Sequence, residues 1–205
     1  MKQQDSGSNT SRTISDADAE PWCDEDQLPE ETRCKIEAMK MMTRWLIGLK
    51  DDIKATQKTL RMLTAFIVHH GDLTDSGRMS RAEMSWLRLS AATSMLKICQ
   101  QKGVGDQFTV DQFYRVSFLL ADDVAQVRQK FAAKLHRGLD RMPPRSLPLD
   151  FMGIYALAGT EQDETIRGST LFYSTANSLN YLSLLIYVIY AFGIVWANKR
   201  NRVEL

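Results

Sequence analysis

The most informative segment of the chain is residues 95–159, which read MLKICQQKGVGDQFTVDQFYRVSFLLADDVAQVRQKFAAKLHRGLDRMPPRSLPLDFMGIYALAG. Two amphipathic segments follow one another in it, with Asp122 and Asp123 at the turn between them. A Val-Arg pair, Val127 and Arg128, comes early in the second segment. Such a pattern is typical of one unit of a helical solenoid, which buries its apolar face only by stacking on neighbouring units. It therefore favours a binding role over catalysis.

Capping signals place the helices of this stretch and of the segment before it. Ser80 with Glu83, and Thr109 with Gln112, form capping boxes in which side chains and backbone N–H groups satisfy one another. They predict helices over about 80–101 and 110–120, and a further helix ends near Leu139. That last helix has an apolar stripe formed by Val124, Val127, Phe131, Leu135 and Leu139.

Upstream, the apolar period begins at Arg33 and predicts helices over about 33–48 and 53–69, packed against each other as antiparallel neighbours. The pair His69-His70 suggests a metal site, but adjacent helical residues point about 100° apart and cannot share one ion. Gly71 favours the alternative, a helix C-terminal cap. Downstream, Pro148 opens one more predicted helix through Ala158.

The helix pairs recur about every forty residues, in units near 33–70, 80–107 and 109–139, which is the period of HEAT and armadillo arrays. No segment of 33–159 alternates long enough to be a strand, so the class is all-α, with antiparallel pairs stacked as a solenoid fragment. In the HEAT pattern the turn aspartate caps the second helix and the arginine reaches the next unit's turn. The predicted structural residues are Asp123, Val127, Arg128, Phe131 and Leu135.

Four cations flank the apolar stripe of the helix that ends near Leu139. They are Lys130, Lys134, Arg137 and Arg141, at steps of four, three and four residues. One interpretation is a ridge that faces an acidic peptide or nucleic acid. The alternative is a solvated rim whose methylene stems cover the core.

Composition narrows the function classes. Residues 1–32 carry nine acids and two bases, whereas residues 33–170 carry twenty-one bases and fifteen acids. The cysteines Cys23, Cys34 and Cys99 form no CxxC pair, and the latter two lie in helical patterns that predict packing roles. We find no nucleophile–base pair, metal cluster or nucleotide loop in the sequence, so we expect no enzyme activity, metal, cofactor or small-molecule substrate.

Several long segments carry a more specific resemblance. MTRWLIGLK, GDLTDSGRMSRAEMSWLRLSAATSMLKICQQKGVGDQFTVDQFY, DVAQVRQKFAAKLHRGL and LPLDFMGIYALAG are similar to the cohesin-associated "precocious dissociation of sisters" family, over residues 33–159. The resemblance implies a nuclear, chromatin-associated HEAT-repeat scaffold that binds the kleisin subunit of cohesin. It also implies a role in sister-chromatid cohesion and, with Wapl, in cohesin release.

The two ends differ from this middle. We expect an acidic disordered head over 1–32, a linker over 160–180, a hydrophobic helix over 181–197 and a basic tail over 198–205. Residues 181–197 read YLSLLIYVIYAFGIVWA, which meets the short end of a membrane span. The alternatives are a buried helix, or an unrelated tail joined to a truncated chain. A membrane-anchored helical adaptor is therefore the second functional reading.

Overall fold

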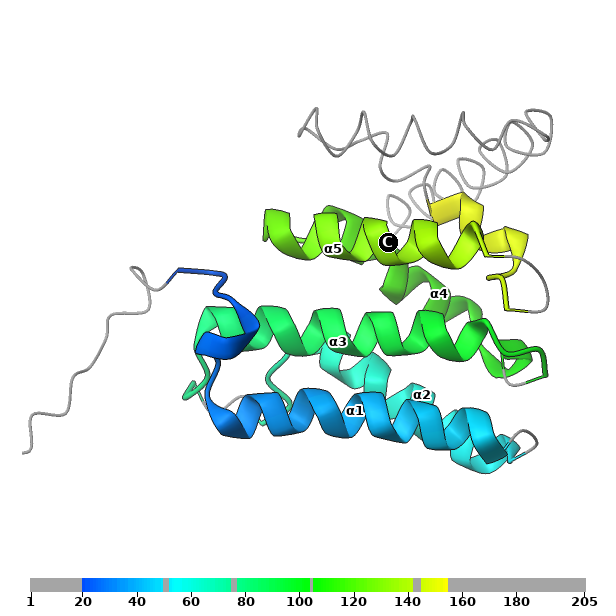
Figure 1. Ribbon diagram of the computed structural model, residues 1–205, viewed down its shortest axis with the longest axis horizontal. Coiled ribbons are helices and arrows are strands. Elements are labelled where there is room, and N and C mark those ends of the chain that lie inside the picture. Colours follow the sequence, from blue (N-terminus) through cyan, green and yellow to red (C-terminus); the bar gives the residue numbers. More distant parts are fainter. Residues whose placement is uncertain (1–19, 50–51, 75–76, 104, 142–144, 155–205) are drawn as a thin grey trace, which may run out of the picture.

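Two layers of helices build the fold (Figure 1). The computed structural model describes residues 20–49, 52–74, 77–103, 105–141 and 145–154. In the first layer, α1 (Glu30–Leu49), α3 (Arg81–Cys99) and α5 (Ala125–Leu139) lie side by side. In the second layer, α2 (Ile53–Val68) contacts α4 (Val110–Ser117). The described part of the chain contains no strand, so the expected all-α stack of helix pairs is confirmed.

The central helix is α3, whose buried residues lie around most of its circumference. Thirteen of its nineteen residues are buried, including Leu87, Ala91 and Met95 on one side and Leu89 and Leu96 on others. Both α1 and α2 pack mainly against α3 and only weakly against each other. The two helices are neighbours as expected, but α3 is the larger partner of each, because periodicity gives a helix's apolar face and not the neighbour that covers it.

Both capping boxes form as predicted. The Ser80 side chain accepts the backbone N–H of Glu83 while Glu83 accepts the N–H of Ser80, and Thr109 and Gln112 do the same at the start of α4. The last turn of the predicted helix 110–120 tightens into the 3₁₀ helix η3 (Phe118–Ala121). Two more short 3₁₀ helices are η2 (Gly105–Gln107) and η4 (Leu149–Ile154). The predicted helix from Pro148 is 3₁₀ over its described part, and residues 155–159 lie outside the described ranges.

Gly71 ends α2 as expected. Its backbone has φ +104°, and its N–H donates to the carbonyl of Phe66 at 2.7 Å. A Cβ atom here would collide with the backbone of Met84 on α3. Glycine is therefore required at this position for two reasons: the left-handed backbone conformation and the close approach of α3.

The segment before α1 is packed against the fold, which corrects the expectation of disorder as far as residue 32. Trp22 stacks on Trp86 of α3 with ring centroids 4.5 Å apart, and Leu28 is buried. The carbonyl of Cys23 accepts the indole N–H of Trp86 at 2.9 Å. The 3₁₀ helix η1 (Glu25–Gln27) follows, and α1 begins at Glu30 instead of Arg33. Trp22 and Leu28 anchor this segment, and two isolated apolar side chains form no period that the sequence would show. Residues 1–19 lie outside the described ranges.

The turn before α5 is held by Asp122, whereas the sequence pattern pointed to Asp123. The Asp122 carboxylate accepts the backbone N–H of Val124 at 2.9 Å, and Asp123 is exposed. Arg128 donates to the carbonyl oxygens of Asp122 and Asp123, at 2.6 and 3.3 Å. These bonds hold its own turn, whereas the repeat pattern suggested that the arginine reaches the turn of the next unit. Val127, Phe131 and Leu135 are fully buried in the core.

Helices of the described ranges lack the combination of length and apolar character that a bilayer crossing requires. The hydrophobic segment 181–197, the linker 160–180 and the basic tail 198–205 lie outside those ranges.

Candidate functional site

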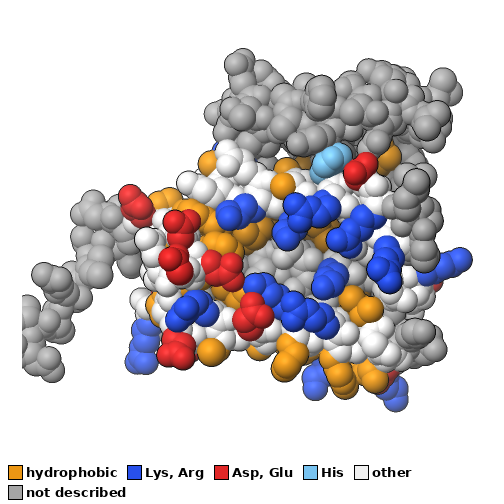
Figure 2. Space-filling model, in the orientation of Figure 1, with side chains coloured by type: hydrophobic (Ala, Val, Ile, Leu, Met, Phe, Trp, Pro, Cys, Tyr) orange, Lys and Arg blue, Asp and Glu red, His pale blue; other side chains and the backbone are white. Residues whose placement is uncertain are grey.

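A groove of about 380 Å³ crosses the layer formed by α1, α3 and α5. Figure 2 shows Lys and Arg side chains gathered over this face. We call it the basic groove. Its charged lining consists of one acid, Glu37, and six cations: Lys40, Arg44, Lys97, Lys134, Arg137 and Arg141.

Helical spacing brings these cations to one place. Lys40 and Arg44 are four residues apart on α1, so they lie on the same face of that helix. Lys134 and Arg137 are three apart on α5, and Arg141 follows the helix end by two residues. The lining also includes the small residues Thr93 and Ser94 of α3 and Gly138 of α5. Long side chains of α1 and α5 therefore flank the small side chains of α3.

Gly138 has a packing reason to be small. A Cβ atom there would lie 2.5 Å from a methyl carbon of Leu147 and 3.0 Å from the amide nitrogen of Gln100. The close approach of Leu147 is also fixed by the backbone, because its N–H donates to the Gly138 carbonyl at 2.9 Å. The glycine thus lets the segment after α5 fold back beside the groove.

Two of the six cations already have partners within the fold. Lys40 forms ion pairs with Glu37 at 2.8 Å and with Glu25 at 3.2 Å. Arg141 donates to the side-chain carbonyl of Gln100 at 2.9 Å. In the portion of the chain that the structure describes, no carboxylate forms an ion pair with the other four, which are Arg44, Lys97, Lys134 and Arg137.

The surplus of positive charge affects Lys134 directly. Partial withdrawal of its amine from water lowers the pKa of Lys134, and the positive charges of Arg137, Lys40, Lys97 and Arg141 lower it further. Burial and like charges both disfavour the protonated form of an amine. The groove therefore holds cations whose mutual repulsion an incoming anion would relieve.

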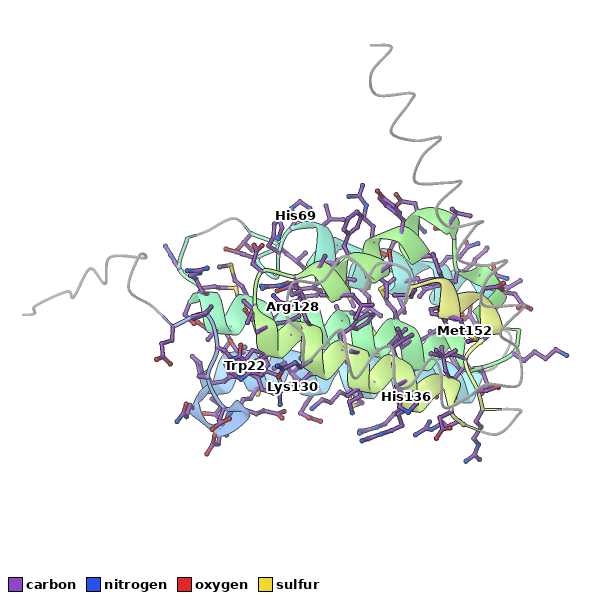
Figure 3. All side chains as sticks on the ribbon, turned by 90° about the horizontal axis from the view of Figure 1, so that it is seen from above. Trp22, His69, Arg128, Lys130, His136 and Met152 are labelled. Atoms are coloured by element: carbon purple, nitrogen blue, oxygen red, sulfur yellow. The ribbon has the colours of Figure 1, made fainter. Side chains whose placement is uncertain are left out.

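Lys130, the first residue of the predicted ridge, does not line the basic groove. Its amine lies over the rings of Trp22 and Trp86, 5.3 and 5.2 Å from their centroids (Figure 3). These are cation–π contacts, which hold the segment before α1 against α5. The other three ridge residues, Lys134, Arg137 and Arg141, do line the groove.

Sequence reasoning missed half of the groove. Lys40, Arg44 and Lys97 belong to helices distant in the chain, and each sits at the rim of an amphipathic pattern like many solvated lysines and arginines. A signal was present in the four-residue spacing of Lys40 and Arg44 on one side of α1. Only the packing of α1 and α5 on either side of α3 shows that Lys40 and Arg44 lie near Lys134, Arg137 and Arg141.

Among the residues that the structure describes, the cysteines and the metal-binding residue types form no second site. Burial raises the pKa of the Cys99 thiol, and burial together with Asp24, Glu83 and Asp26 raises that of Cys23, so both thiols stay protonated at neutral pH. Cys34 is exposed, which corrects its expected packing role. Across the described ranges, His, Cys, Asp and Glu form no group of three or more able to hold a metal ion.

The fold and the groove define a class: this is a helical-repeat protein, built from antiparallel helix pairs in two layers, with a charged surface across one of them. The family described as "Sister chromatid cohesion protein PDS5 protein" matches residues 3–191. This range is wider than residues 33–159, over which the sequence resemblance was expected. The chain belongs to the PDS5 family of sister chromatid cohesion proteins.

Curated relatives agree with this assignment. The chain is 41% identical over 141 residues to PDS5 homolog B-B of Xenopus laevis, covering 68% of this chain and 9% of the relative. It is 40% identical over 141 residues to PDS5 homolog B of Homo sapiens, with 68% and 10% covered. For PDS5 homolog A-B of Xenopus laevis the identity is 36% over 151 residues, with 73% and 11% covered. The chain thus spans about a tenth of the length of these relatives.

Proposed function

We propose that this chain is a non-catalytic scaffold that binds cohesin subunits on chromatin in the nucleus and regulates cohesion and cohesin release. Membership of the sister chromatid cohesion family is the observation that carries the proposal. The kleisin subunit and Wapl are the partners that the family resemblance suggests. A stack of helix pairs suits this role, because it presents long side chains from successive helices on one continuous surface.

The basic groove supports the proposal from the chain's own residues. Five more cations than acids line it, six against one. Charge of one sign on a recessed surface raises both the rate and the selectivity of association with a partner of opposite charge. A partner segment rich in acidic groups is the complement that this surface favours.

Co-precipitation tests the proposal. A tagged full-length chain, expressed in vertebrate cells, is expected to be recovered with chromatin and to retain cohesin subunits. The variant Lys134→Glu with Arg137→Glu should retain less cohesin. Lys54→Glu with Lys58→Glu is the matched control, because it changes the net charge equally at two exposed positions of α2.

Extraction separates the scaffold from the membrane-anchored adaptor suggested by residues 181–197. A chromatin-bound scaffold leaves the pellet with salt, since its charge interactions are screened. Release by detergent alone, with no cohesin subunit retained, would favour the adaptor and contradict the scaffold.

A further inference from the structure

The basic groove has more positive charge than the fold itself neutralises. Glu37 is its one carboxylate, and that group already pairs with Lys40 at 2.8 Å. Arg44, Lys97, Lys134 and Arg137 come from three different helices, and the described part of the chain gives none of them an ion pair. Like charges held close together raise the free energy of the fold, so such a cluster is stabilised by an external anion.

The shape of the groove limits what that anion is. Its volume, about 380 Å³, lies at the lower end of the range of about 300–1,000 Å³ seen for ligand pockets. The small side chains of Thr93 and Ser94 line the groove on α3, between the two flanking helices. A groove of this size admits a few side chains of a peptide, whereas the backbone of a nucleic-acid duplex follows a long exposed surface.

The charge on this face is also divided between its two ends. A second depression, beside the start of α1, is lined by Glu25, Asp26, Glu30 and Glu37 with a single cation, Arg33. Figure 2 shows these opposite charges gathered in different parts of the same face. A nucleic acid, whose backbone is uniformly negative, would be repelled where it ran beyond the basic groove. A peptide can carry an anionic segment and a basic flank together.

The kind of anionic group follows from the charge density. A carboxylate carries one negative charge, whereas a phosphoserine or phosphothreonine carries about −1.5 to −2 and three strong acceptor oxygens. Arg44 and Arg137 offer guanidinium groups that bind such oxygens in pairs, and Lys97 and Lys134 add point charges. One or two phosphates balance the groove's excess of five cations better than the same number of carboxylates.

We propose that the basic groove binds a phosphorylated peptide segment, with the phosphate among Arg44, Lys97, Lys134 and Arg137 and a basic flank toward Glu25 and Glu30. The segment belongs to a protein partner, so this inference rests on the proposed scaffold function and specifies how one partner is held. Binding in this groove would then depend on a kinase acting on the partner.

The test uses the full 205-residue chain, purified in mild detergent, and fluorescence anisotropy. The probe is a labelled synthetic peptide with two phosphoserines and a Lys-Arg flank. The comparison ligands are the same peptide without phosphate, a duplex DNA of equal charge, and inorganic phosphate as a competitor. We expect phosphorylation to tighten binding by at least about tenfold, equivalent to about 1.4 kcal/mol.

Charge reversal locates the site. Lys134→Glu with Arg137→Glu should weaken phosphopeptide binding by about tenfold or more, whereas Lys54→Glu with Lys58→Glu should change it by less than about twofold. Lys134→Gln with Arg137→Gln, combined with a circular-dichroism melt, separates loss of the site from loss of the fold, because glutamine removes charge without adding repulsion. A melt equal to that of the parent chain, with weakened binding, supports the proposal.

Several results would overturn it. These are equal affinity for the phosphorylated and plain peptides, duplex DNA bound more tightly than the phosphopeptide, and complete competition by inorganic phosphate at the peptide's own concentration. Cohesin retained by a chain that binds no phosphopeptide removes this inference and leaves the scaffold function standing. Phosphopeptide binding in the groove by a chain that retains no cohesin would remove the cohesin scaffold function and leave the phosphopeptide site.

Discussion

The guanidinium group of Arg88 on α3 binds the carboxylate of Asp122, in the turn before α5, through two parallel hydrogen bonds. Nε donates to Oδ2 at 2.6 Å and Nη2 donates to Oδ1 at 2.9 Å. The two side chains are 10% and 9% exposed, so the pair is almost removed from water. Arg88 also donates from Nη1 to the carbonyl of His70 at 3.3 Å. One side chain thus joins the end of α2, the centre of the first layer and the turn into α5.

Removing one member of this pair should strongly destabilise the fold. We expect Asp122→Ala to lower the free energy of unfolding by about 3–5 kcal/mol, because it leaves the Arg88 charge buried without its partner. Urea unfolding followed by circular dichroism measures the loss. Asp123→Ala, at the exposed neighbour, should stay within about 0.5 kcal/mol. Equal losses at the two positions would show that the ion pair does not hold the turn.

Gly71 is expected to tolerate no side chain. Gly71→Ala should cost about 2 kcal/mol or more, since it combines the strain of a positive φ with a collision against the Met84 backbone. Gly77→Ala is the control, because Gly77 has φ +63° but nothing within 4 Å of the added Cβ. The melting temperatures of the two variants should therefore differ. Identical melting temperatures would show that the positive φ alone, and not the collision with Met84, accounts for the loss of stability.

Truncating the core of α5 tests the packing of the first layer. Phe131 is fully buried, and Phe131→Ala should cost about 3–5 kcal/mol as a truncated core aromatic. Phe118, which is 45% exposed, provides the comparison, and Phe118→Ala should cost about 1 kcal/mol or less. A loss near zero at Phe131 would mean that α5 does not depend on this stripe.

Glu83 is expected to make part of the stability depend on pH. Burial opposes its ionisation, but hydrogen bonds from Thr32 and Ser80 outweigh this effect and lower the pKa of Glu83 below its usual 4.5. A carboxyl group with a lowered folded-state pKa stabilises the fold above its unfolded pKa. That contribution is lost as the pH falls through the lower, folded value.

The variant Glu83→Gln measures this contribution. It should lower the free energy of unfolding by about 1 kcal/mol at neutral pH, as expected for a weakened helix cap. The difference from the parent chain should shrink as the pH falls below 4.5. Glu31→Gln, which alters only an exposed i,i+4 pair with Lys35, is the control. A difference in unfolding free energy between variant and parent that does not change with pH would show that the charge of Glu83 does not contribute to capping.

The starts of α3 and α4 followed from sequence because a capping box is completed within four residues. Ser80 with Glu83 and Thr109 with Gln112 each close their hydrogen bonds locally, without a distant partner. Segments that depend on a distant contact were not found. The stretch around Trp22 has no apolar period, yet it is ordered by the stack on Trp86 and the bond from that indole to Cys23, 63 residues apart.

The candidate site shows the same division. Lys134, Arg137 and Arg141 share one side of a single helix and its end, so their spacing predicted them together. Lys130, four residues before Lys134, contacts the Trp22 and Trp86 rings instead of the groove. Lys40, Arg44 and Lys97 enter the groove only because α1 and α5 lie on either side of α3.

The all-α class and the caps of α3 and α4 could be predicted from the sequence, because they depend on hydrogen bonds and apolar periods within a few turns of chain. The family followed from the similarity of several long segments to known members. Three features emerged from the three-dimensional packing: the place of α3 between α1 and α5, the role of Asp122 instead of Asp123 in the turn, and the meeting of six cations in one groove. The physical reason is that helix stacking is set by side-chain packing between residues far apart in the chain, which local spacing does not specify.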